Sequence, residues 1–112
     1  MSARGETTLW IAQRASAAVL ALCVAVHIGV MVYAVQGGLS AAEILARTRG
    51  SAGWAAFYGV FVAAVAVHVP IGLRAVAVEW LGWRGRSLGV ALHLFAALLL
   101  ALGLRAVWAV VA

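Results

Sequence analysis

The 112-residue sequence has no lysine, one proline, one cysteine and only three acidic residues. Charged residues make up 10% of the chain, and every basic residue is an arginine. A soluble protein that binds nucleic acid would carry clustered basic side chains on a polar background, and this sequence has no such clusters. Cys23, being alone, excludes an internal disulfide and cannot hold an iron–sulfur cluster, which needs several cysteine thiolates.

Apolar residues are abundant instead, at 67% of the chain, where a soluble domain has roughly half. Three apolar stretches are long enough to cross a hydrocarbon core, which takes about 20 helical residues. Backbone groups in lipid must be satisfied internally, and no alternating strand pattern is visible. The sequence therefore predicts an all-α integral membrane protein, a single anchor domain over 1–112 with membrane helices at about 10–35, 54–80 and 87–111.

The residues that flank these stretches predict the topology. The five tryptophans fall near the predicted helix ends, as in the aromatic belts of membrane proteins. Five arginines lie on the N-terminal flank and the second connection, and three lie on the opposite side. This asymmetry predicts a cytoplasmic N-terminus and an external C-terminus. We expect the membrane to be a bacterial-type inner membrane. The first apolar run has no small-residue cleavage site, so we expect it to be retained rather than removed as a signal peptide.

The two connections differ. Residues 36–53 form a long loop rich in small residues, and within it Ser40 followed by Glu43 fits a capping box. We expect a short interfacial helix over 40–47. Residues 81–86, "LGWRGR", form a tight connection.

Each predicted membrane helix contains one histidine: His27, His68 or His93. Polar side chains inside a bilayer are costly and usually face an interior, a partner or a cofactor, and neutral imidazole is a common axial ligand of haem. Packing between helices is the alternative role. His27 lies in the outer half of its helix and His68 in the cytoplasmic half of its own. We therefore expect either one haem on His68 or two haems at different depths, completed by a partner subunit.

The surroundings of His68 favour a flat ligand. Ala64 and Gly72 lie one helical turn on either side of it and leave room for a porphyrin or for a neighbouring helix. Pro70 removes one helical hydrogen bond and should bend the helix nearby. Arg74 lies near the cytoplasmic interface, where it either anchors the helix, pairs with haem propionates or meets a soluble partner. For His93 three roles remain as alternatives: haem binding, quinone binding and helix packing.

Polar residues also mark the cytoplasmic mouth of the first helix. Gln13, Arg14 and Ser16 lie where a lipid headgroup or a quinone head would sit. Quinone carbonyls need hydrogen-bond donors, and arginine and serine supply them. The alternative role for Arg14 is that of a topology determinant.

Two stretches carry a family resemblance. "HVPIGLRAVAVEW" resembles the H-x-x-x-G-[IL]-R stretch on the second helix of cytochrome b-type membrane anchors of succinate dehydrogenase and fumarate reductase. "QRAS" is similar to the family's [HQ]-R-x-[ST]-G motif on the first helix. The length and the three predicted helices also agree with that family.

The resemblance implies a role for each matching residue. His68 matches the family's haem-ligating histidine, and Gly72 and Arg74 match the rest of that motif. Arg14 matches an arginine near the quinone head and a haem propionate, with Ser16 following it. The sequence departs from the pattern at Ala17, where the family has Gly, and at residues 10–11, where a quinone-binding Ser is common. His27 resembles the first-helix histidine of the two-haem branch.

The resemblance also implies a function that the chain cannot perform alone. A flavoprotein subunit would interconvert succinate and fumarate, as in the tricarboxylic acid cycle, and an iron–sulfur subunit would pass electrons to quinone. This chain, with a second anchor subunit, would form part of a hetero-oligomeric helix bundle that holds haem b. The alternatives are a small cytochrome b of another dehydrogenase and a haem-free structural anchor. A small multidrug-type transporter is disfavoured, because Glu6, Glu43 and Glu79 all lie at helix ends or in loops.

Overall fold

The computed structural model describes residues 2–112, and every regular element in that range is a helix. The helices are α1 (Ala3–Gln36), α2 (Ala41–Thr48), α3 (Ala52–Leu81) and α4 (Arg86–Val111). Three of them, α1, α3 and α4, are long and apolar enough to cross a membrane. The predicted all-α fold with three membrane helices is therefore confirmed.

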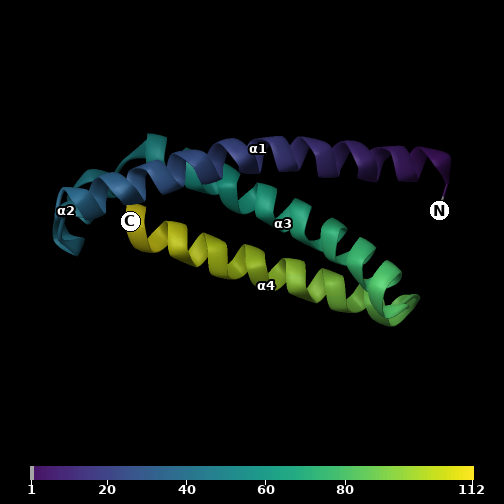
Figure 1. Cartoon of the computed structure of the whole chain (residues 1–112). Helices are drawn as coiled ribbons and strands as arrows, with labels where there is room; N and C mark the ends of the chain where they lie inside the picture. Colours follow the sequence, from purple (N-terminus) through teal and green to yellow (C-terminus); the bar gives the residue numbers. More distant parts are fainter. Residues whose placement is uncertain (1) are drawn as a thin grey trace.

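The long helices form an open, elongated arrangement in which α3 packs against both α1 and α4 (Figure 1). The molecule measures 49 × 25 × 23 Å, so its long axis exceeds the roughly 30 Å of a hydrocarbon core. Figure 1 also shows that the N-terminus and the α3–α4 connection lie at one end of the molecule, whereas α2 and the C-terminus lie at the other end.

Local sequence signals explain where the helices begin. Ser2 caps α1 by accepting a hydrogen bond from the backbone N–H of Gly5, and Ser51 caps α3 by accepting one from Trp54. Ser40 caps α2, accepting from the N–H of Glu43 at 3.2 Å and donating to its carboxylate at 3.0 Å. The short helix expected from this capping pattern is present, over Ala41–Thr48.

The α3–α4 connection depends on glycine. Gly82 ends α3 with a φ of 63°, in the left-handed region, and the next N–H, that of Trp83, donates to the carbonyl of Ala77. Gly85 has a φ of 91° immediately before α4. Pro70 lies inside α3, which nevertheless continues as one helix to Leu81.

Few side chains are buried within the chain itself. The buried apolar residues of the described range are Cys23, Ala64, Ala77, Leu88 and Leu92, while most large apolar side chains on the membrane helices are exposed. Lipid tails are as apolar as leucine, so such helices associate through close packing and polar contacts rather than by burying apolar surface from water. At Gly103 a Cβ atom would lie 2.6 Å from Val62 Cγ1, so α3 and α4 approach closely only because residue 103 is glycine.

Two hydrogen bonds fasten the α2 segment to the end of α4. The hydroxyl of Thr48, which is buried, donates to the carbonyl of Val110 at 2.6 Å. The N–H of Gly50 donates to the carbonyl of Val111 at 2.8 Å. These bonds satisfy carbonyl groups that have no partner within the last turn of a helix.

Replacing Thr48 by valine should weaken this attachment, because the variant keeps the shape of the side chain but loses the donor. We expect the free energy of unfolding in detergent to fall by about 1 kcal/mol. The control is Thr7→Val, since the exposed Thr7 hydroxyl bonds only the carbonyl of Ala3 in its own helix. Equal losses in the two variants would show that the contact with α4 contributes nothing.

Candidate cofactor and quinone site

The polar residues of α1 and α3 pair in an antiparallel register. Ser16 lies beside His68, Gln13 lies beside Gly72, and His27 lies beside Tyr58. Each contact further along α1 is thus made with a residue nearer the start of α3. This register separates His68 and His27 along the membrane normal, as their sequence positions predict.

The first cluster surrounds His68. Its Nδ1 lies 3.4 Å from the Oγ of Ser16, and the Ser16 hydroxyl lies 3.1 Å from the backbone carbonyl of Gln13. Ser16 is buried, whereas His68 is half-buried. The α1–α3 interface therefore holds one edge of the imidazole and leaves Nε2 without a hydrogen-bond partner among the described residues.

Gly72 serves this interface directly. A Cβ atom at residue 72 would lie 3.2 Å from Nε2 of Gln13, so the glycine accommodates the amide group of α1. Ala64 is also buried, at 7% exposure. Of the two roles open for Gly72 from the sequence, room for a helix and room for a porphyrin, the structure displays helix packing.

Gln13 itself has an unusual environment. Its side-chain oxygen is buried and has no hydrogen-bond partner among the described residues. A buried acceptor without a donor is costly, and such atoms often face a ligand or water. In the sequence Gln13 is a polar residue at the helix mouth and the first residue of "QRAS", and its buried, unpartnered oxygen is apparent only in the structure.

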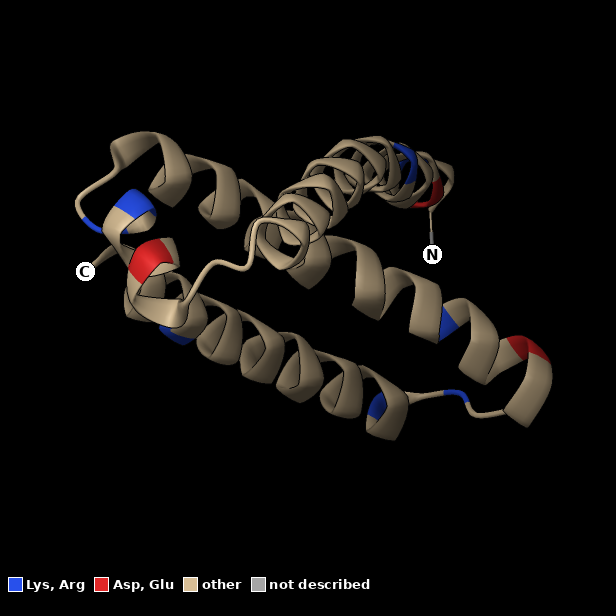
Figure 2. Ribbon diagram, turned by 60° about the vertical axis from the view of Figure 1, so that its left-hand side comes forward, with Lys and Arg blue, Asp and Glu red and all other residues tan. Residues whose placement is uncertain are grey.

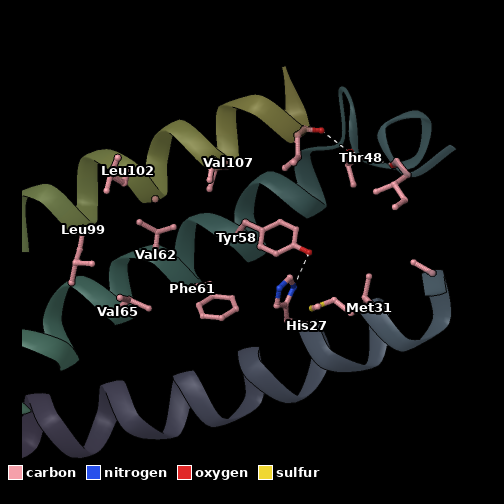
Figure 3. Close-up of a pocket in the computed structure, with 16 residues that line it drawn as sticks. His27, Met31, Thr48, Tyr58, Phe61, Val62, Val65, Leu99, Leu102 and Val107 are labelled. Carbon is pink, nitrogen blue, oxygen red and sulfur yellow. Dashed lines mark hydrogen bonds between the residues drawn. The ribbon is translucent and has the colours of Figure 1, made fainter. Parts of the chain in front are cut away.

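The second cluster surrounds His27 (Figure 3). Its Nδ1 lies 3.3 Å from the hydroxyl of Tyr58, and its ring packs edge-to-face against Tyr58 and Phe61. In the sequence Tyr58 is an ordinary aromatic residue near a helix end and carries no motif signal. Its contact with His27 is apparent only in the structure.

A cavity of about 640 Å³ adjoins this second cluster. Figure 3 shows His27 on α1, Tyr58 and Phe61 on α3, and Leu99, Leu102 and Val107 on α4 around it. Ile44 and Thr48 of α2 line its end. The lining is almost entirely apolar, so the His27–Tyr58 pair is the main polar feature of this space.

His93 and Arg74 occupy a different position. Both line a smaller cavity of about 390 Å³, together with Leu9, Ala66, Pro70, Ile71, Leu92 and Ala96. The Nδ1 of His93 lies 2.7 Å from the carbonyl of Gly89 in its own helix. The structure therefore brings Arg74 together with His93, whereas His68 faces Ser16 of α1.

Arg14 is exposed at the start of the membrane-spanning part of α1. Its guanidinium carbon lies 5.1 Å from the ring centroid of Trp10, one turn earlier. This cation–π contact holds the guanidinium near the helix surface while leaving its N–H groups without a hydrogen-bond partner among the described residues. Arg14 and Ser16, neighbours in the motif, thus differ: one is open to the outside and the other is enclosed.

In the described range, no group of three or more His, Cys, Asp or Glu side chains comes together as a metal site. The histidines are instead isolated, each with a separate partner at Nδ1. Any metal bound by one of them would need further ligands from a cofactor or another subunit.

The fold defines the class of the chain: it is a multi-pass membrane protein with three spanning helices. The family model described as "Succinate dehydrogenase/Fumarate reductase transmembrane subunit" matches residues 1–110, and the chain belongs to that family. The resemblance found in the two motifs is thereby confirmed, and membership implies association with the other subunits of such a complex. No curated protein and no solved structure matches the chain.

Enlarging Gly72 should separate α1 from α3. In Gly72→Leu the added side chain meets the Gln13 amide, and we expect a loss of about 1–3 kcal/mol, the usual cost of overpacking. Thermal unfolding of the purified protein measures this loss. Gly59→Leu is the matched control, because a Cβ at residue 59 of the same helix meets nothing within 4 Å. A Gly72 variant as stable as the Gly59 variant would contradict the assigned contact.

Proposed function

We propose that this chain anchors a succinate:quinone oxidoreductase in a bacterial inner membrane, binds haem b through His68 and forms part of the quinone site. Family membership supports the anchor role. The observation that carries the haem assignment is the contact between His68 Nδ1 and Ser16 Oγ, which leaves Nε2 unpartnered. Metal-ligating histidines commonly donate their other ring N–H to a protein acceptor in this way.

Of the residues around His68, only the histidine itself would supply a ligand to a haem iron. A neutral imidazole supplies one ligand, and the described chain brings no second histidine to the same depth in the α1–α3 interface. A further ligand would come from the second anchor subunit. When bound, the haem would supply a one-electron carrier close to the quinone site.

His27 fits a second haem on similar grounds. Its Nδ1 has a partner in Tyr58, and the adjoining apolar cavity of about 640 Å³ offers room for a flat, apolar group. His27 and His68 are separated along the bundle, which favours two haems at different depths rather than one haem bound by both histidines. The chain would then hold one haem in each half of the membrane.

The quinone site is proposed at the mouth of α1. Arg14 offers N–H donors to a quinone carbonyl, and the amide of Gln13 provides both a donor and an unpartnered acceptor close by. An amide of this kind can donate to the carbonyl of a quinone and accept from the hydroxyl of a quinol. The arginine distribution supports placing this mouth on the cytoplasmic side, where an iron–sulfur subunit would deliver electrons.

The remaining polar residues have narrower proposed roles. Arg74 and His93 share a cavity, so we assign them to one bound group or one partner segment rather than to the haem on His68. Oxidation of succinate belongs to the flavoprotein subunit, and the chain is not an enzyme by itself. Its single cysteine supplies one thiolate, whereas an iron–sulfur cluster needs several.

The haem assignments predict distinct losses. In the purified complex, His68→Ala should abolish one set of b-type bands in the reduced-minus-oxidised spectrum, and His27→Ala should abolish a second set. The control is His93→Ala, which should keep the full haem content. If neither His68→Ala nor His27→Ala lowers the haem content, the chain is a haem-free anchor.

The quinone assignment predicts a change in KM. Arg14→Gln removes the charged donor, so the KM for quinone should rise at least tenfold, equivalent to about 1.4 kcal/mol or more of lost binding. Quinone-dependent succinate oxidation by the assembled complex measures it. Arg4→Gln, in the first turns of the same helix, is the control and should leave this KM unchanged. A KM that is unaltered in Arg14→Gln would place the quinone elsewhere.

A further inference from the structure

The hydroxyl of Ser16 is enclosed between two polar neighbours. The residue is 8% exposed, and its Oγ has two neighbours, the carbonyl of Gln13 at 3.1 Å and Nδ1 of His68 at 3.4 Å. A carbonyl oxygen only accepts, and at the shorter of the two contacts the hydroxyl donates its single hydrogen to the carbonyl of Gln13. With the hydrogen placed there, the Ser16 oxygen is left to accept from Nδ1 of His68.

The roles at the 3.4 Å contact depend on the tautomer of His68, and the donation of the Ser16 hydrogen to Gln13 favours the tautomer with a hydrogen on Nδ1. Because Ser16 accepts, Nδ1 of His68 carries the hydrogen, and in the neutral ring Nε2 keeps its lone pair. We infer that Ser16 is a positioning residue that sets the tautomer and the ring orientation of His68 as a metal ligand. Ser16 thus leaves the quinone site, which its place at the mouth of the first helix had suggested, and this inference rests on the haem function proposed for His68.

The other two histidines emphasise the difference. The neighbour of His27 is the hydroxyl of Tyr58, which is able to donate or accept, so either tautomer satisfies that contact. The neighbour of His93 is the backbone carbonyl of Gly89, which no substitution of a side chain removes. Of the three histidines, only His68 contacts a side-chain hydroxyl whose hydrogen is already donated to another group. That side chain can be replaced by mutation.

The hydrogen bond should also change the ligand electronically. An acceptor on Nδ1–H increases the basicity of Nε2, and a more basic ligand stabilises the oxidised iron relative to the reduced iron. Loss of the acceptor should therefore raise the haem midpoint potential. It should not abolish haem binding, because the imidazole itself remains.

The test is a redox titration of the reduced-minus-oxidised haem spectrum in the purified complex carrying Ser16→Ala. We expect retained haem, a raised midpoint potential for the haem on His68 and an unchanged KM for quinone. Ser16→Cys preserves the volume but offers a weak acceptor, so it should behave like Ser16→Ala. Ser16→Thr keeps the hydroxyl and should restore the potential of the unaltered protein.

The matched control is Thr8→Ala. The Thr8 hydroxyl also donates to a backbone carbonyl of α1, that of Arg4, but it is exposed and faces no histidine. Loss of this hydroxyl should leave the midpoint potential unchanged. The comparison separates the effect of the contact with His68 from the effect of removing any hydroxyl from α1.

Three results would overturn the inference. One is an unchanged potential in Ser16→Ala, the second is a raised quinone KM without a change in potential, and the third is a shift that Ser16→Thr fails to reverse. Failure of the haem proposal looks different, since His68→Ala would then keep the haem content. The two failures are therefore distinguishable in one set of variants.

Discussion

The need to pair polar side chains inside the membrane governs how α1 and α3 fit together. Water does not compensate an exposed imidazole, amide or hydroxyl in the hydrocarbon core, so each must find a neighbour within the protein. Ser16 and His27 of α1 find theirs along α3 in one antiparallel register, and Gln13 lies over Gly72 in the same register. Sliding one helix along the other by a turn would break these contacts together. The polar residues thus specify the register of α1 against α3, which the uniform apolar surfaces of the two helices would not specify.

The same pairing connects structure to the proposed chemistry. A histidine with one ring nitrogen held by a neighbouring helix presents the other nitrogen in a defined direction. His68 and His27 both meet this condition, at different depths, whereas the Nδ1 of the exposed His93 is held only by its own helix. The charged residues stay away from this interior, lying near the helix ends and connections (Figure 2). The polar contacts between α1 and α3 therefore involve no Arg, Asp or Glu side chain.

Much of this organisation is readable from the sequence. Three apolar runs predict the three spans, the Ser40 and Glu43 pair predicts α2, and the depth of each histidine follows from its position in its span. The partners are not readable. Ala64 and Gly72 suggest a small-residue surface, but only the register of α1 shows that Gln13 occupies the space over Gly72. Likewise, the adjacent motif residues Arg14 and Ser16 appear equivalent, and their separation into exposed and enclosed follows from which face of α1 meets α3. Tyr58 has no periodic or motif signal of its own.

The bonds from Thr48 and Gly50 to Val110 and Val111 carry a consequence for biogenesis. They join segments about 60 residues apart in the chain, so they cannot form until α4 has been synthesised and has crossed the bilayer. The α1–α3 pair, by contrast, needs nothing beyond α3. The contacts of α1 with α3 can thus form before α4 is in place, whereas the bonds of the α2 segment need the end of α4. A chain without its α4 would have a loose α2 segment, with His27 and His68 already held at the α1–α3 interface.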